Sequence, residues 1–177
     1  MVKSEVDSRA KSLAFQPGKI GGMVIKNRLV RSATYEGMAT EDGNVTDELV
    51  KVYKNLAAGG VGLIIASYAY VQSSGKAAPN QTGIDKDDLI PGLRRITQTV
   101  HEHGNGCKIA AQLVHSGRQS FILNETVAPS AVLESVRNIL PREMTIAEIE
   151  ETVEAFAAAV SRVKEAGFDA VQLHAAH

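Results

Sequence analysis

Residues 168–177 read F-D-A-V-Q-L-H-A-A-H, and this stretch decides the fold. A long amphipathic pattern ends at Gly167, and a short apolar run follows at 170–173. Two histidines, His174 and His177, come directly after that run. A helix, a glycine, an apolar strand and then polar residues form the unit from which α/β barrels build their sites. We therefore expect both histidines at the C-terminal rim of a parallel sheet.

The same unit of amphipathic helix, glycine-containing turn and apolar strand occurs three times. The strands of these units are predicted at 61–66, 108–114 and 170–173, and an earlier strand is predicted at 27–32. Repeated alternation of helix and strand implies right-handed crossovers and a parallel sheet. The sequence thus predicts an α/β fold of the TIM (β/α)8-barrel family, here its first four strands and three helices. An open doubly wound sheet is the alternative, although no G-x-G-x-x-G motif follows any predicted strand.

Local signals mark where the three helices begin. Thr46 is placed to cap the first helix, and Pro91 belongs in the first turn of the second. Thr145 and Glu148 have the spacing of a capping box for the third. Apolar residues then recur on one face of the third helix, which predicts a buried stripe. The stripe consists of Ile149, Val153, Phe156, Val160 and Val163.

Composition indicates one globular domain. The chain has 177 residues, 44% of them hydrophobic, which is typical of a globular domain. We expect a polar N-terminal arm at 1–14, followed by a barrel half at 15–177 that opens with a hairpin. The net charge of −1 gives no reason to expect nucleic acid or a membrane surface as a partner. No apolar window is long enough to span a bilayer, and the N-terminus lacks the apolar core of a signal peptide. With Cys107 as its single cysteine, the chain is expected in the cytoplasm.

The ends of the predicted strands carry residues suited to chemistry. Strand ends at 32–35, at 66–68, at Gln112 and at the two histidines would meet on one face of a parallel sheet. A carboxamide offers a donor and an acceptor side by side, which suits the amide edge of a flat heterocycle. Two neutral imidazoles can donate to one oxygen and stabilise an enolate or a phenolate.

Each of these residues has an alternative interpretation. Gln112 can satisfy backbone groups at the rim, and Tyr68, expected in a loop at 67–88, can simply pack there. The H-x-x-H spacing can hold a metal when a third ligand is present, and His115 is the candidate for that position. A metal-dependent barrel hydrolase using His115, His174 and His177 is therefore the weaker alternative, and the favoured interpretation includes no metal.

Six motifs in order resemble the old yellow enzyme family of FMN-dependent NADH:flavin oxidoreductases and ene-reductases. They are I-K-N-R-L-V-R-S-A-T at 25–34, G-G-V-G-L-I-I at 59–65, A-A-Q-L-V-H-S-G-R-Q at 110–119, A-P-S-A at 128–131, P-R-E-M-T at 141–145 and E-A-G-F-D-A-V-Q-L-H-A-A-H at 165–177. This resemblance covers nearly all of 15–177. It implies an (α/β)8 barrel with FMN at the C-terminal face, which agrees with the pattern of helices and strands.

The resemblance also implies roles for individual residues. Flavin contacts are implied for Ser32, Ala33, Thr34, Tyr35, Tyr68, Gln112 and His174, with Gln112 at the pyrimidine edge. His174 and His177 match the pair that binds the carbonyl oxygen of the substrate. The implied reaction takes hydride from NADH or NADPH to FMN and passes it to the β-carbon of an activated alkene.

Two features depart from the family pattern. Tyr35 stands where relatives often carry a Cys or Thr that tunes the flavin, and the sequence ends before the proton-donating tyrosine of many relatives. The resemblance therefore covers the N-terminal half of a barrel, and we expect a truncated chain with little activity of its own. A half barrel leaves sheet edges exposed, so a homo-oligomer or a complementing C-terminal half is expected as partner. The alternative is a non-catalytic fragment that pairs in the same way.

Overall fold

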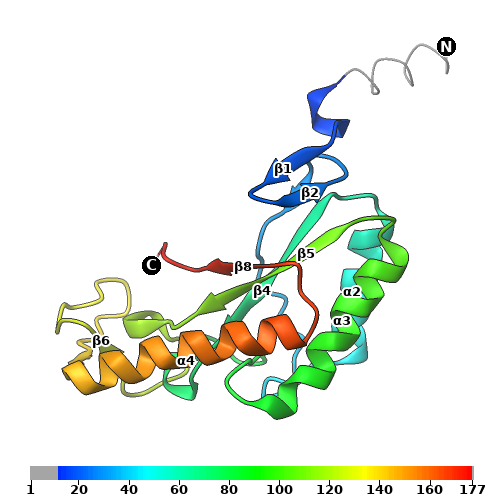
Figure 1. Ribbon diagram of the computed structural model, residues 1–177. Helices are drawn as coiled ribbons and strands as arrows, with labels where there is room; N and C mark the ends of the chain where they lie inside the picture. Colours follow the sequence, from blue (N-terminus) through cyan, green and yellow to red (C-terminus); the bar gives the residue numbers. More distant parts are fainter. Residues whose placement is uncertain (1–11, 177) are drawn as a thin grey trace, which may run out of the picture.

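A computed structural model describes residues 12–176 of the chain. Its centre is a parallel sheet of four strands in the order β3-β4-β5-β8 (Figure 1). The strands are β3 (Val30–Arg31), β4 (Leu63–Tyr70), β5 (Lys108–Val114) and β8 (Ala170–Leu173). The helices between them are α2 (Asp47–Ala58), α3 (Ile90–His103) and α4 (Ile146–Glu165). This order confirms the predicted succession of four parallel strands and three helices.

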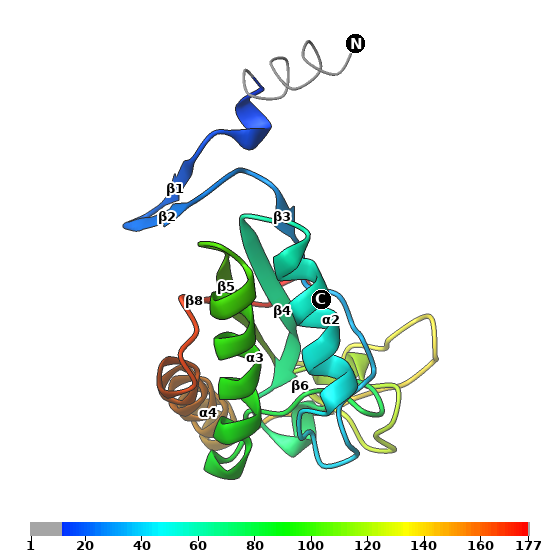
Figure 2. The same ribbon diagram turned by 90° about the vertical axis from the view of Figure 1, so that its right-hand side faces the viewer.

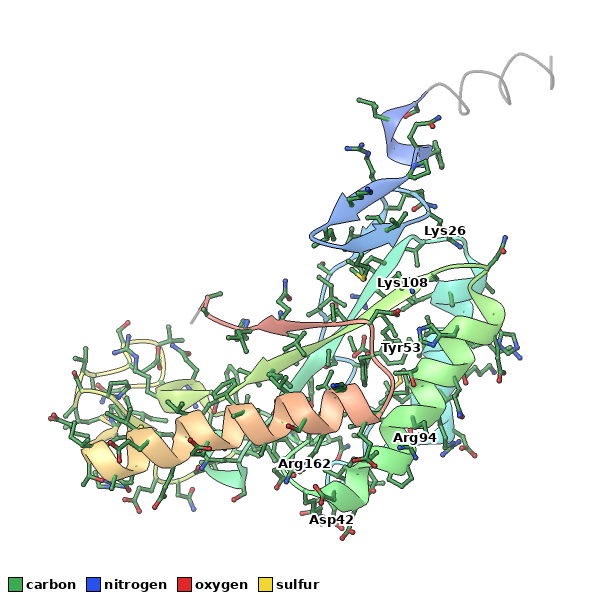
Figure 3. All side chains as sticks on the ribbon, in the orientation of Figure 1. Lys26, Asp42, Tyr53, Arg94, Lys108 and Arg162 are labelled. Atoms are coloured by element: carbon green, nitrogen blue, oxygen red, sulfur yellow. The ribbon has the colours of Figure 1, made fainter. Side chains whose placement is uncertain are left out.

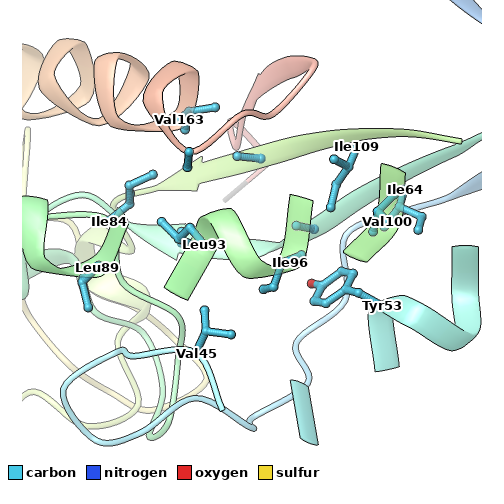
Figure 4. Close-up of a cluster of buried hydrophobic side chains, with 14 of the residues drawn as sticks. Val45, Tyr53, Ile64, Ile84, Leu89, Leu93, Ile96, Val100, Ile109 and Val163 are labelled. Carbon is cyan, nitrogen blue, oxygen red and sulfur yellow. The ribbon is translucent and has the colours of Figure 1, made fainter. Parts of the chain in front are cut away.

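The three helices pack against one face of the sheet, as the second view shows (Figure 2). Ile64 and Ile109 point from the strands into this layer, where they meet residues such as Tyr53, Ile96 and Val100 (Figure 4). Each fully buried aliphatic side chain of this kind stabilises the fold by about 1.5–3 kcal/mol. The helix layer is therefore the main hydrophobic core of the described residues.

The opposite face of the sheet carries a much smaller apolar cluster. Leu63 and Ala110 alternate with the residues of the main core and pack with Ile25, which comes from the N-terminal hairpin. Successive side chains of a β-strand point to opposite faces of the sheet. The positions in register with this cluster lead along β5 and β8 to the C-terminal edge of the sheet, where the site lies.

Capping residues begin the helices where the sequence predicted. The Thr46 hydroxyl accepts a hydrogen bond from the Leu49 amide, and Pro91 lies in the first turn of α3. The Thr145 hydroxyl accepts from the Glu148 amide while the Glu148 carboxylate accepts from the Thr145 amide, which completes a capping box. Such caps satisfy backbone N–H groups that have no partner within the helix.

Polar contacts at the helix surfaces connect α4 to its neighbours (Figure 3). Arg94 of α3 donates to the backbone oxygen of Glu165 at 3.1 Å. Arg162 donates through Nε to a carboxylate oxygen of Asp87 at 2.6 Å. These contacts fix α4 along α3, and they thereby fix the direction in which the chain enters β8.

The buried stripe predicted for α4 is wrong in part. Ala159 and Val163 are its fully buried residues, whereas Val153 and Val160 are 61% and 41% exposed. The helix is 20 residues long, and its N-terminal part runs beyond the sheet toward the loop of β6 (Figure 1). Helical periodicity shows which face is apolar, but the length of the sheet determines how much of that face is covered.

Two predicted strands have different bounds. The strand predicted at 27–32 is shorter in the structure, where β3 pairs with β4 at Val30–Arg31. The Leu29 oxygen before it still accepts from the Gly62 and Leu63 amides. The strand predicted at 61–66 is instead β4, Leu63–Tyr70, so the loop predicted at 67–88 begins later. A register shift between Ile65 and Tyr68 lets β4 continue past the small polar Ser67. Tyr68 is therefore held in a strand rather than in a loop.

The remaining elements are small. The predicted hairpin is formed by β1 (Gly18–Ile20) and β2 (Met23–Ile25) and projects from the N-terminal end of the sheet (Figure 1). Most of the predicted arm at 1–14 lies outside the described residues, apart from the start of a 3-10 turn at Leu13–Phe15. The segment at 115–144 contains a two-stranded parallel pair, β6 (Val127–Ala128) and β7 (Arg142–Glu143). Among residues 12–176, no helix is long and apolar enough to cross a membrane.

Candidate active site at the C-terminal edge of the sheet

A pocket of about 360 Å³ lies at the C-terminal ends of the strands. Its volume falls in the range of small-molecule sites, which is roughly 300–1,000 Å³. The pocket is lined by Ala33, Tyr68, Ala77, Gln112, Val114, Ser116, Gln119, Phe121 and His174. Ala33, Tyr68, Gln112 and His174 are four of the residues expected at the site, and they come from chain segments that follow or end four different strands.

Strand register explains why these side chains meet. Tyr68 of β4 is directly opposite Gln112 of β5, and Gln112 is directly opposite Gln172 of β8. His174 follows β8, and its amide donates to the Leu113 carbonyl at 2.9 Å, which continues the ladder by one step. The buried carboxamide of Gln112 donates through Nε2 to Gln172 Oε1 at 2.6 Å.

Three aromatic rings form a row that runs from beside the pocket into its lining. The rings of Tyr35 and Tyr68 have centroids 5.9 Å apart, and the rings of Tyr68 and His174 are stacked with centroids 6.1 Å apart. Burial raises the pKa of both phenols, and for Tyr68 the neighbouring Tyr35 adds to the rise. Both phenols are therefore neutral near pH 7. The Tyr35 hydroxyl donates to the Pro79 backbone oxygen, so this ring is held beside the pocket rather than in its lining.

The segment at 32–35 follows β3 and is arranged by a partly buried ion pair. Arg31 donates through Nη1 to the Ser32 backbone oxygen and to the Thr34 hydroxyl. Its Nη2 donates to Glu36 Oε1 at 3.3 Å. The structure thus places Ala33 in the pocket lining, while the side chains of Ser32 and Thr34 are exposed.

His177, the second histidine of the predicted pair, lies outside the described residues. His115 accepts a hydrogen bond at Nδ1 from the Gly117 amide at 3.1 Å, so its proton is on Nε2, which faces the Ser74 hydroxyl at 3.4 Å. Burial lowers the pKa of His115 and keeps its ring neutral. Between residues 12 and 176, no group of three His, Cys, Asp or Glu side chains is placed to hold a metal ion.

Several lining residues were not predicted from the sequence. Val114, Ser116 and Gln119 lie within the motif at 110–119, so the motif itself was a signal for them. Ala77 and Phe121 come from two separate loops that a hydrogen bond joins, from the Phe121 amide to the Ala77 oxygen at 2.6 Å. No local sequence pattern indicates that pairing.

The donor set suits the ring system of a flavin better than its phosphate. Gln112 can pair with an amide edge, Tyr68 and His174 provide flat surfaces, and Ala33 leaves room for a ring to approach. No lysine or arginine is part of the lining, so the described lining offers no cationic side chain to a phosphate. These features together define the class of protein as an α/β fold of barrel type whose rim pocket suits a flat heterocycle.

Comparison with known proteins identifies the family. Residues 13–177 match the NADH:flavin oxidoreductase / NADH oxidase family, and the chain belongs to that family. It is 42% identical over 168 residues to an NADPH dehydrogenase of Geobacillus sp. (strain WCH70), which covers 94% of this chain and 49% of that relative. It is 40% identical over 168 residues to an NADH oxidase of Thermoanaerobacter brockii, covering 92% of this chain and 26% of that relative.

Solved structures confirm the fold. An old yellow enzyme from Pichia sp. AKU4542 has a TM-score of 0.85 at 28% identity, covering 93% of this chain and 46% of that one. Morphinone reductase in complex with tetrahydroNAD has a TM-score of 0.82 at 28% identity, covering 94% and 50%. The chain thus spans about half the length of most of these relatives, and its fold is half of their TIM barrel.

Proposed function

We propose that this chain carries the flavin-facing half of an FMN-dependent oxidoreductase of old yellow enzyme type. In this proposal the whole enzyme takes hydride from NADH or NADPH and delivers it to the β-carbon of an activated alkene such as an enone. The observation that carries the proposal is the convergence of Tyr68, Gln112 and His174 from three parallel strands on one pocket. Membership of the NADH:flavin oxidoreductase / NADH oxidase family supports it.

Bound FMN would supply the hydride chemistry, and the residues of this chain would bind and orient. Gln112 is assigned to the pyrimidine edge, because its carboxamide is buried and faces the pocket. Ala33, with backbone contacts from Ser32, Thr34 and Tyr35, is assigned to the edge of the ring that β3 approaches. Tyr68 is assigned a further backbone contact at the strand end.

His174 and His177 are assigned to the substrate. Two imidazole N–H groups that donate to one carbonyl oxygen withdraw electron density from the conjugated alkene, which makes its β-carbon electrophilic. His174 lines the pocket and stacks on Tyr68, so it also touches the space assigned to the flavin. A hydrogen bond at the carbonyl oxygen that strengthens as charge develops there would lower the barrier to hydride transfer.

A second half is part of the proposal, because within residues 12–176 strand β8 has a neighbour on one side only. The side chains of Val171 and Leu173 in this strand are exposed. An unpaired strand edge is a template for another strand. We propose that a complementing C-terminal half, or a second copy of this chain, covers that edge. The chain alone is then expected to have little turnover. The same edge supports the alternative function, a non-catalytic half barrel that pairs in this way.

A cytoplasmic location is proposed from the single buried thiol, Cys107.

The test is flavin retention by the purified chain. The chain is mixed with FMN, passed through gel filtration, and its visible absorbance is compared with that of Gln112→Leu and of Leu173→Ala as a matched control. The expected result is retained flavin in the wild type and in Leu173→Ala, and weaker retention in Gln112→Leu. Equal retention by all three would contradict the assigned role of Gln112, and stoichiometric metal without flavin would support the hydrolase alternative instead.

A further inference from the structure

We propose that Gln172 is a positioning residue that holds the carboxamide of Gln112 in one of its two orientations. The inference deepens the proposed function and rests on it, because Gln112 is the residue assigned to the flavin edge. Gln172 Oε1 accepts a hydrogen bond from Gln112 Nε2 at 2.6 Å, and Gln172 is not part of the pocket lining. Gln172 therefore acts on the site through its neighbour.

Register makes this contact a consequence of the sheet. Gln112 of β5 and Gln172 of β8 are direct partners in adjacent parallel strands, so their side chains leave the sheet on the same face. The preceding pair on that face is Ala110 and Ala170, which has no polar side-chain atoms. Among the described residues, the bond to Gln172 is the side-chain hydrogen bond that Gln112 makes.

The chemistry of a carboxamide makes its orientation important. Each amide has two N–H donors on one side and one acceptor oxygen on the other. One N–H of Gln112 donates to Gln172, so the second N–H and the oxygen remain for the pocket. These two groups can form hydrogen bonds with an adjacent C=O and N–H on a flat ring. Rotation of the amide by half a turn exchanges donor and acceptor, and the same ring edge would then meet two mismatched groups.

Three substitutions at Gln172 test whether its side chain acts on Gln112 as a hydrogen-bond acceptor. Gln172→Glu keeps an acceptor of the same length and removes the donor, Gln172→Lys keeps only a donor, and Gln172→Leu removes both. The side chain of Gln172 is exposed at the edge of the sheet, so each variant is expected to fold. Leu173→Ala is the control, because it changes the same strand on its other face. Circular dichroism checks the fold of all four.

The first measurement uses the 15N-labelled chain without flavin. The Gln112 side-chain amide is expected to keep its resonance positions in Leu173→Ala. In Gln172→Glu its bonded proton is expected to move further downfield, because a carboxylate acceptor strengthens the hydrogen bond. In Gln172→Leu and Gln172→Lys the same proton is expected to move upfield, because the acceptor is gone. The second measurement is FMN affinity from absorbance titration. Gln172→Glu is expected to bind FMN like the wild type. Gln172→Leu is expected to bind FMN roughly tenfold more weakly, because a hydrogen bond between two uncharged groups is lost.

The outcomes separate this inference from the proposed function. Unchanged Gln112 amide resonances in Gln172→Leu would overturn the inference, and so would an upfield shift of the bonded proton in Gln172→Glu. If the wild-type chain takes up no FMN while the amide resonances respond as expected, the positioning contact stands and the flavin assignment fails for this chain. If FMN binds and all Gln172 variants bind it equally, the flavin assignment stands and the inference fails.

Discussion

The Nη2 atom of Arg31 lies 3.3 Å from Glu36 Oε1, and the side chain of Glu36 is only 8% exposed. The same guanidinium donates to two acceptors in the segment between them, the Ser32 oxygen and the Thr34 hydroxyl. One arginine therefore closes the turn that carries Ala33 into the pocket. Burial raises the pKa of the Glu36 carboxyl, and the charge of Arg31 opposes that rise.

Removing Arg31 alone is expected to destabilise the chain. Arg31→Met leaves the Glu36 carboxylate buried without its partner, and the expected loss in the free energy of unfolding is about 2 kcal/mol. Arg31→Met combined with Glu36→Gln is expected to lose less, because no buried charge is left behind. Urea unfolding of Arg31→Met, Glu36→Gln, the double variant and the wild type measures this. A double variant as unstable as the sum of both single variants would contradict the coupling.

Leucine substitutions at paired positions of β5 and β8 should differ strongly. Leu113 is fully buried and Leu173, its partner in register, is 61% exposed. Leu113→Ala is expected to cost about 3 kcal/mol because it leaves a cavity in the helix layer. Leu173→Ala is expected to change stability by about 0.5 kcal/mol or less. Urea midpoints of the two variants compare them, and similar losses would mean that the edge of β8 is covered in solution.

The capping box of α4 predicts a pH dependence at acid pH. Hydrogen bonds from Arg142 and from the Thr145 amide lower the pKa of Glu148 to about 2, from an ordinary value of 4.5. A carboxyl with a lowered pKa stabilises the fold fully above its unfolded pKa, and that contribution is lost as pH falls from 4.5 toward 2. Glu148→Gln is therefore expected to flatten the fall in melting temperature over this interval.

The matched control for Glu148 is Glu150→Gln, which removes an exposed carboxylate from the same helix. Melting temperatures are recorded from pH 7 to pH 2 for both variants and the wild type. The difference between wild type and Glu148→Gln should shrink as pH falls, whereas Glu150→Gln should follow the wild type. A constant difference for Glu148→Gln at every pH would show that the carboxylate charge does not contribute.

A glycine before β4 is required by a close approach of the backbone. A Cβ added at Gly62 would lie 2.2 Å from the Asn27 backbone oxygen, whereas one added at Gly22 would meet no atom within 4 Å. Gly62→Ala is expected to cost about 2 kcal/mol, because the segment before β3 must move away from β4. Gly22→Ala is the control and is expected to stay within about 0.5 kcal/mol of the wild type. Thermal unfolding measures both, and an unchanged Gly62→Ala would show that the two segments are loosely joined.

The interior of the sheet was predictable where a local pattern was complete. The strand expected at 108–114 has the bounds of β5, because a mostly apolar run between Gly106 and His115, interrupted by Lys108 and Gln112, leaves little choice. The strand expected at 61–66 continues to Tyr70, since polar and aromatic residues there are accepted by pairing with β5. Pairing with β5 extended that strand past Ser67, across the register shift between Ile65 and Tyr68.

Residue types and order along the chain determined the succession of strands and helices, the caps at Thr46 and Thr145, and the candidate residues Gln112 and His174. Apolar periodicity and capping act over a few residues, so they can be read directly from the sequence. Tertiary structure alone decided that Val153 is exposed and that Gln112 meets Gln172. These contacts depend on strand register and on the length of the sheet, which are set by pairing between segments as many as 60 residues apart.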